Sequence, residues 1–187
     1  MDNLLKNIRE CTVCNEYLQP NPVVFVTKTS KIIIIGQAPG IKVHQSGIPW
    51  DDASGKQLRK WLGVTDEEFY NTDNFGIIPM GFCYPGKGKS GDLPPRKECA
   101  PKWHPQLLEK MPNVQLVILI GMYAQKYYLK NNSKRTLTET VSSFEEYLPK
   151  YFVLPHPSPR NRFWLTKNPW FQKNILPQLK IKVSQII

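Results

Sequence analysis

The chain has 187 residues, of which 41% are hydrophobic and 11% aromatic, a composition typical of one folded domain with a sizeable core. Its 25 Lys and Arg residues against 15 Asp and Glu give a formal net charge of +10, which favours a polyanionic partner such as nucleic acid. No apolar run approaches the roughly 18 residues of a membrane span, and the polar N-terminus lacks the apolar segment of a signal peptide. We therefore expect a cytoplasmic protein, one domain over residues 1–187, whose four cysteines are metal ligands or free thiols rather than disulfides.

Hydrophobic periodicity predicts the elements of the N-terminal half. A helix capped by Asp2 comes first, and a short strand is expected over residues 23–26. Residues 32–35 are four isoleucines ended by glycine, a run typical of a strand buried on both faces. A helix over 54–62 and a second strand over 75–80 follow.

Residues 83–103 are rich in Gly, Pro and Lys and show no periodicity, which predicts a long loop, and loops of that length are usually functional. The expected elements beyond it are a helix ending near residue 110, a strand over 114–120, a helix over 121–128, a helical segment over 136–148, a strand over 151–154 and a C-terminal helix with Asn168 and Pro169 as cap and first position. Strands that alternate with helices predict an α/β fold, with a parallel sheet covered by helices on both sides.

Two loops follow predicted buried strands and are candidates for a ligand site. Residues 36–40, GQAPG, come directly after the isoleucine strand, and residues 155–161, PHPSPRN, come after the last strand. The carboxyl ends of parallel strands share one sheet edge, where open α/β sheets bind ligands. Backbone N–H groups in such a loop can face an anion or a carbonyl oxygen. An ordinary strand–loop connection is the alternative.

The four cysteines occur as two pairs, Cys11 and Cys14, then Cys83 and Cys99. Two thiolates with two residues between them can grip one metal ion, and four complete a tetrahedral site or hold an iron–sulfur cluster. The spacing alone does not separate zinc from iron–sulfur. In either case the predicted role is structural, since the metal would join the 83–99 loop to the N-terminal helix.

Together, the GQAPG loop, the HPSP sequence at residues 156–159 and the four cysteines at this spacing resemble the uracil-DNA glycosylase superfamily, most closely its iron–sulfur (family 4-like) branch. The aromatic segment of that branch corresponds here to residues 47–50, GIPW, and the resemblance runs from Cys11 to about Trp170. It implies a central four-stranded parallel sheet flanked by helices, a [4Fe–4S] cluster with structural zinc as the alternative, and removal of a damaged base, typically uracil, from DNA. We expect such a protein to be monomeric and associated with the nucleoid.

Two positions depart from the family pattern. The acid of the first loop is replaced by Gln37, and residues 77–81, IIPMG, contain no amide where the family reads uracil with an Asn. The identity of the base is therefore open. A protein that binds or traps a damaged base without turnover is the alternative to a glycosylase.

Cutting an N-glycosidic bond builds negative charge on the departing base and positive charge on the sugar. His156, held between two prolines, can donate a hydrogen bond to the base, as can the N–H groups near Gln37 and Ala38. Asp52 lies near the place where a related branch has an acid that acts on water. Since Asp51 and Asp52 precede a predicted helix, either could instead serve only as its cap.

Three further assignments complete the predicted site. Trp50 offers a flat face for a flipped base, with a place in the core as the alternative. His44 is a weaker candidate for lining the base pocket, and His104 is expected to be structural. The predicted DNA contacts are at the tip of the last loop, where a side chain could fill the gap left by the flipped base: Ser158, Arg160 and Asn161.

Overall fold

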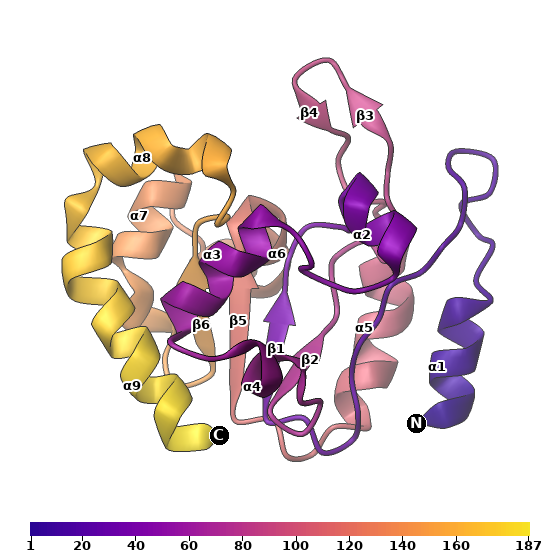
Figure 1. The fold of residues 1–187 in the computed structure, drawn as a ribbon, viewed down its shortest axis with the longest axis horizontal. Coiled ribbons are helices and arrows are strands. Elements are labelled where there is room, and N and C mark those ends of the chain that lie inside the picture. The colour runs from indigo at the N-terminus through magenta and orange to yellow at the C-terminus, as the bar shows by residue number, and fades with distance from the viewer.

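The computed structural model describes residues 1–187 and is built on a four-stranded sheet in which every strand pair is parallel. The strands lie in the order β2 (Phe75–Ile77), β1 (Ile32–Ile35), β5 (Leu116–Ile120), β6 (Tyr151–Leu154). In Figure 1, α3 (Ala53–Leu62) lies in front of this sheet and α6 (Gly121–Leu129) lies behind it. The α/β class and the central four-stranded parallel sheet flanked by helices are therefore confirmed.

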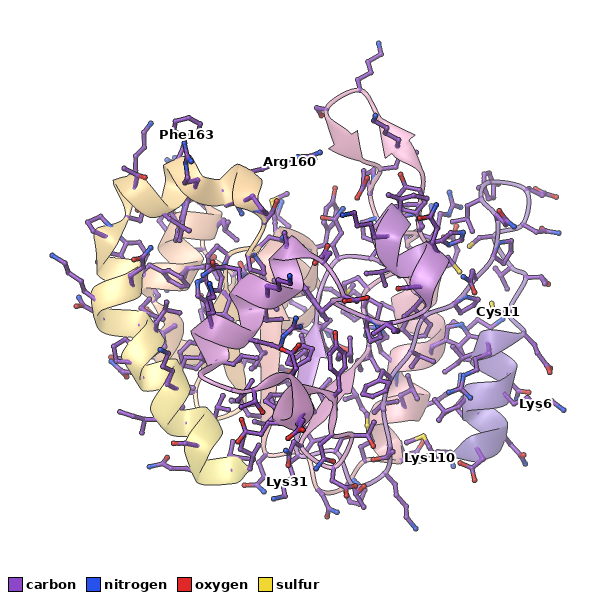
Figure 2. All side chains as sticks on the ribbon, viewed as in Figure 1. Lys6, Cys11, Lys31, Lys110, Arg160 and Phe163 are labelled. Carbon is purple, nitrogen blue, oxygen red and sulfur yellow. The ribbon has the colours of Figure 1, made fainter.

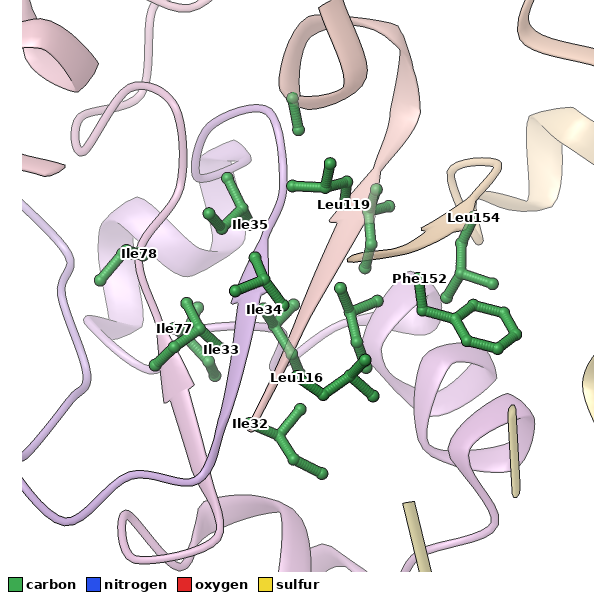
Figure 3. Close-up of a cluster of buried hydrophobic side chains, with 14 of the residues drawn as sticks. Ile32, Ile33, Ile34, Ile35, Ile77, Ile78, Leu116, Leu119, Phe152 and Leu154 are labelled. Atoms are coloured by element: carbon green, nitrogen blue, oxygen red, sulfur yellow. The ribbon is translucent and has the colours of Figure 1, made fainter. Parts of the chain in front are cut away.

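The isoleucine strand β1 is the centre of the core. All four of its side chains are fully buried, and it pairs with β2 on one side and β5 on the other. Figure 3 shows these isoleucines among side chains of the neighbouring strands, including Leu116 and Phe152. Burying each such side chain stabilises the fold by roughly 1.5–3 kcal/mol, which fixes the sheet edge from which the candidate loops start.

The N-terminal segment differs from expectation in two details. Helix α1 (Asp2–Arg9) forms with its apolar face buried, but Met1 rather than Asp2 occupies the cap position. The strand expected over residues 23–26 is wrong, because this segment makes only one isolated bridge, from Phe25 to Ile77 at the end of β2. Phe25 and Ile77 exchange both of their backbone hydrogen bonds, whereas the N–H of Val23 donates to the carbonyl of Phe82, beyond the end of β2.

The 83–103 segment is not a single loop. It contains a small antiparallel hairpin of β3 (Lys87–Gly88) and β4 (Gly91–Asp92), and α5 (Cys99–Glu109) begins inside it. Strands of two residues are too short to leave a periodic pattern, which is why the sequence did not indicate them. The hairpin projects beyond the body of the molecule in Figure 1.

The other elements are short. They are α2 (Ile41–Ser46), α4 (Asp66–Tyr70), α7 (Leu137–Ser142), α8 (Arg162–Lys167), α9 (Leu176–Ile186), 3-10 turns at Lys130–Asn132, Phe144–Tyr147 and Pro159–Asn161, and a π-helical turn at Phe171–Ile175. Helical structure resumes at Pro169, as expected, although Asn168 ends α8. No helix of the structure has the length and apolar character needed to cross a membrane.

Candidate active site

Loops from the carboxyl edge of the sheet enclose one cavity of about 590 Å³. Its walls come from the loops after β1, β2 and β6, from the segment before α3, and from the β3–β4 hairpin. This is the place where the strand order turns from β1 toward β2 on one side and β5 on the other, the usual ligand site of open α/β sheets. The cavity brings together most of the predicted site residues: Gln37, Ala38, Trp50, Asp52, His156, Ser158, Arg160 and Asn161.

The loop after β1 is held by the loop after β2. The N–H of Met80 donates to the Gly36 carbonyl and the N–H of Gly81 donates to the Gln37 carbonyl, each at 2.9 Å. The N–H groups of Gln37 and Ala38 themselves donate to no backbone oxygen. They are therefore free to bind a carbonyl oxygen or an anion at the cavity wall.

His156 is positioned as a neutral hydrogen-bond donor. Its Nδ1 accepts a hydrogen bond from the N–H of Ser158 at 3.2 Å, so in the neutral ring the proton lies on Nε2. Burial lowers the pKa of His156, while the negative charges of Asp52 and Asp92 act in the opposite direction. Asn161 Nδ2 donates to the His156 carbonyl at 2.7 Å and so fixes the loop that carries the imidazole.

Trp50 connects the cavity to the core. Its ring lies at a centroid distance of 5.6 Å from the His156 ring, with 33° between the two planes. One edge of the indole lies so close to Gly36 that a Cβ there would be 2.9 Å from Trp50 Cζ2. The ring packs against the core, which was the alternative for Trp50, and it also lines the cavity.

Asp52 does cap the helix. Its Oδ1 accepts a hydrogen bond from the N–H of Gly55 at 2.8 Å, at the start of α3. The same carboxylate lines the cavity, whereas Asp51 is exposed and does not. One oxygen of Asp52 is thus occupied by a structural bond.

His44 lies outside the cavity lining. Its ring is 5.9 Å from that of Tyr84, and its buried Nδ1 has no hydrogen-bond partner. The Asn21 side chain donates to the His44 carbonyl at 2.6 Å, which ties the helix α2 to the N-terminal segment. His44 is therefore not among the residues that line the cavity.

His104 is structural, as expected. It is 1% exposed, and its Nε2 donates to the Pro79 carbonyl at 3.0 Å while its Nδ1 is 2.6 Å from the Tyr128 hydroxyl. Burial lowers the pKa of His104 to about 4. Because Pro79 lines the cavity, this buried histidine holds the backbone at the position where the family pattern has an Asn.

The hairpin contributes cavity residues that the sequence did not identify: Ser90, Gly91 and Asp92. The Arg160 side chain packs on it so closely that a Cβ on Gly91 would lie 2.7 Å from Arg160 Nη1. Figure 2 shows the side chain of Arg160 directed toward the hairpin. The only signal in the sequence was the Gly- and Lys-rich composition of this stretch. It indicates a functional loop but not which of its side chains reaches the cavity.

An exposed aromatic residue follows the last loop. Phe163, in the first turn of α8, is 76% exposed. It lies at the same end of the molecule as Arg160 (Figure 2). An apolar side chain beside Arg160 and Arg162 is a feature that bases can use as a stacking surface.

The four cysteines converge on a second, small cavity. They reach it from the end of α1, from the segment after β2 and from the start of α5, and all four line a space of about 10 Å³. Burial raises the pKa of Cys83 to about 11 and also raises the pKa of Cys99. As placed, no three His, Cys, Asp or Glu side chains are close enough together to hold a metal ion. The predicted ligands are thus gathered, but their thiols do not form a closed shell.

The sequence model of the uracil DNA glycosylase superfamily matches residues 23–180. One similar solved structure is the solution NMR structure of a candidate uracil DNA glycosylase from Methanosarcina acetivorans, with 17% identity, 87% of this chain and 94% of that chain covered, and a TM-score of 0.48. Another is the crystal structure of wild-type SMUG2 from Pedobacter heparinus, with 13% identity, 92% and 76% covered, and a TM-score of 0.37. Since the family match spans most of the sequence and includes the loops that form the cavity, the chain belongs to the uracil DNA glycosylase superfamily.

Proposed function

We propose that the protein is a monofunctional DNA glycosylase that hydrolyses the N-glycosidic bond of a deaminated base, uracil foremost, in base-excision repair. One observation carries the proposal. The cavity at the carboxyl edge of the sheet holds His156 with its Nε2 proton, the free N–H groups of Gln37 and Ala38, and the indole of Trp50. These are donors for a departing base and a face to hold it, in a chain of this superfamily.

In the proposed reaction the C1′–N bond breaks and its electron pair leaves with the base. Fixed donors aimed at the oxygen of the departing base stabilise that charge without having to reorganise. His156 supplies one donor as a neutral imidazole, and the loop of Gln37 and Ala38 supplies others. The base must first leave the stack of the DNA, which costs a few kcal/mol and is least costly for a mismatched base.

The stacking surface is a face of Trp50 that His156 leaves uncovered. The two rings are at the distance of directly packed aromatic groups, so no layer is open between them for a base. With Pro79 at the position of the family's Asn, selection of the base falls to backbone groups and to the shape of the cavity. Uracil, hypoxanthine and xanthine are the substrates to compare.

DNA is the proposed partner, bound by a chain of net charge +10. In the loop that follows β6, the Ser158 hydroxyl accepts a hydrogen bond from the Arg160 N–H at 3.2 Å, and Asn161 binds the His156 carbonyl. These two residues shape the loop, and Arg160 is its cationic side chain, exposed and lying against Gly91 of the hairpin. We propose that the side chain of Arg160 fills the gap that a flipped base leaves in a duplex.

The experiment is single-turnover release of free base from oligonucleotides that carry each of the three bases. His156→Ala is expected to slow release from the preferred substrate about 100- to 1,000-fold, the usual cost of losing one such donor. Its affinity for lesion DNA should stay nearly unchanged. Gln106→Ala, on an exposed face of α5, is the control and should behave as the wild type.

A trapping binder is the second candidate, favoured by Gln37 at the position of the family's acid. Multiple turnovers of free base from the wild-type protein would exclude it. Tight lesion binding without released base would instead establish it. Near-normal single-turnover rates in His156→Ala would make the histidine structural and contradict the leaving-group assignment.

We further propose that Cys11, Cys14, Cys83 and Cys99 hold a structural metal centre, a [4Fe–4S] cluster or, as the alternative, zinc. The donor set fits, because four thiols from three segments surround one space and four thiolates complete either kind of site. The space, about 10 Å³, has the size of one water molecule, so a cluster requires the thiols to turn outward. Cys11 and Cys83 are partly exposed, whereas Cys14 and Cys99 are buried.

Metal analysis of the purified protein separates these alternatives. A cluster predicts brown protein, broad visible absorption and about four irons per chain. Cys99→Ser should lower the metal content and the thermal unfolding midpoint together. Colourless protein with one zinc per chain would show that the metal is zinc and not iron. Metal-free wild-type protein would contradict the metal centre altogether.

A further inference from the structure

Asp92 brings a carboxylate to the loop from which the family's acid is missing. It belongs to β4 of the hairpin and lines the main cavity. Its Oδ2 lies 3.9 Å from the place where a Cβ on Gly40 would stand. Gly40 ends the GQAPG loop, so the Asp92 carboxylate lies beside the loop in which Gln37 replaces the acid.

Gln37 itself fixes the hairpin at this place. Its Nε2 donates to the carbonyl of Leu93 at 3.4 Å, directly after Asp92. The N–H of Leu93 donates to the Gly86 carbonyl at 2.9 Å and closes the base of the hairpin. The amide at position 37 therefore ties the loop after β1 to the residue that follows Asp92.

Of the two carboxylates in the cavity wall, Asp92 is the one held by the weaker hydrogen bond. Asp52 uses Oδ1 to cap α3 at 2.8 Å, whereas the only polar side-chain contact of Asp92 is a long one, 3.5 Å from Oδ1 to the Tyr84 hydroxyl. Asp92 is exposed, and its charge raises the pKa of His156 against the effect of burial. Both carboxylates are thus within electrostatic reach of the same imidazole.

From this placement we propose that Asp92 holds and activates the attacking water, the role that the first-loop acid would otherwise have. The inference rests on the proposed glycosylase function. The water oxygen forms a bond to C1′ as the C1′–N bond breaks, and the electron pair of that bond leaves with the base toward His156. Asp92 accepts one proton from the water, and the free base takes up a proton from solvent.

A carboxylate at this point also offsets the positive charge that develops on the sugar. It would repel the phosphates of the DNA, but the cations of the same region compensate: Lys87 and Lys89 on the hairpin and Arg160 against Gly91. Removing the charge of Asp92 should therefore leave DNA affinity equal or slightly tighter. A loss confined to the chemical step is the signature of the proposed role.

The test compares Asp92→Asn with Asp51→Asn, which removes the same charge from an exposed residue outside the cavity lining. Single-turnover base release and lesion-DNA affinity are measured for both. Asp92→Asn is expected to slow release about 100- to 10,000-fold, the range for loss of a general base, with affinity unchanged or tighter. Asp51→Asn should match the wild type in both measurements.

Tyr84→Phe tests a purely structural role, since it removes the only side-chain hydrogen bond of Asp92. It should leave the rate within a few-fold of the wild type. Three results would overturn the assignment of Asp92. Tyr84→Phe could be as slow as Asp92→Asn, Asp92→Asn could keep a near-normal rate, or Asp92→Asn could lose rate only because its affinity for lesion DNA falls. A wild-type protein that releases no base overturns the proposed function itself, so the two failures are distinguishable.

Discussion

His104 shows how one buried side chain supports a cavity that it does not line. Its two ring nitrogens are satisfied by Pro79 and Tyr128, and its ring stacks on Phe82 at a centroid distance of 5.6 Å. Such a histidine is neutral in the folded protein, because burial disfavours the imidazolium. A second proton would sit on Nδ1 and turn it from an acceptor into a donor toward the Tyr128 hydroxyl, whereas the bond from Nε2 to the Pro79 carbonyl would remain.

This burial makes stability depend on pH. The pKa of His104 is about 4 in the folded protein and about 6.5 in an unfolded chain, so the unfolded state binds more protons between these values. Stability from this group is therefore complete above about pH 6.5 and is lost as pH falls toward 4. We expect a loss of about 2 kcal/mol in unfolding free energy between pH 7 and pH 5, measured by urea denaturation.

The control is His104→Gln, which places a hydrogen-bonding amide at the site but cannot titrate. It should be less stable than the wild type at pH 7, yet show a smaller further loss at pH 5. His156, whose pKa is also lowered by burial, should contribute the remaining dependence in both proteins. An equal fall in the two proteins would show that His104 is not the titrating group.

At the scale of elements, helix α3 holds Trp50 in a backbone conformation that non-glycine residues rarely adopt. The φ angle of Trp50 is 59°, and such strain costs on the order of 1–3 kcal/mol. Arg59 offsets part of it, since its Nη1 donates to the Trp50 carbonyl at 3.3 Å while its Nε pairs with Asp66 at 2.6 Å. Gly55 allows the approach, because a Cβ there would overlap with that carbonyl.

Gly55→Ala is a direct test of this contact. In a free helix the change would stabilise by about 1 kcal/mol, but here the methyl group must displace the Trp50 backbone. We expect a lower unfolding free energy and at least a tenfold slower base release, because the indole moves away from His156. Lys56→Ala, an exposed change in the same helix, should alter neither. A stabilised, fully active Gly55→Ala protein would contradict the account.

The elements that the sequence predicted well are those with local signals. The four isoleucines of β1 form an apolar run, α3 has helical spacing and ends at Gly63, and β6 covers residues 151–154 as expected. The loops after β1 and β6 could be placed on one sheet edge from strand order alone. Their side chains therefore met in the cavity as the motifs indicated.

The parts that could not be predicted depend on contacts distant in sequence. Asp92 reaches the cavity through a hairpin of two-residue strands, and the base of this hairpin is fixed by Gln37 through Leu93, 56 residues further along the chain. The positive φ of Trp50 requires Arg59 and Gly55 around it, which no local pattern shows. His44 had the residue type of a pocket ligand, but its ring lies beside that of Tyr84, and Lys42 and Val43 are the residues of its helix that line the cavity.

For the whole molecule, the proposed function requires that a chain of net charge +10 act on one base rather than only bind DNA phosphates without selection. Phosphate contacts give affinity that falls steeply with salt, because neutralised phosphates release counterions. Arg160 and Phe163 lie at the end of the molecule that carries the hairpin, while Lys31 and Lys110 lie at the opposite end (Figure 2). Arg160 also lines the cavity, so under the proposed function one DNA molecule would contact both.

Flipping a base out of a duplex leaves a gap in the base stack opposite its partner, which flipping from a single strand does not. When a paired base leaves the stack, the gap must be filled or the base returns, and side chains inserted between base steps are a known solution. Arg160→Ala should therefore reduce capture of a lesion in duplex DNA about tenfold or more. Its loss with a single-stranded lesion should be only that of one phosphate contact, measured as Kd at two salt concentrations.

Phe163→Ala separates the effect of inserting a side chain into the duplex from the effect of charge on DNA binding. It removes an apolar surface at the same end of the molecule without changing the net charge. If the aromatic ring supports the opened duplex, this variant also prefers single-stranded lesions, and its salt dependence equals that of the wild type. Arg160→Ala should instead lower the salt dependence on both substrates. Equal losses on duplex and single strand for both variants would mean that neither fills the gap, and that opening of the base pair is driven from the cavity by the residues that bind the base.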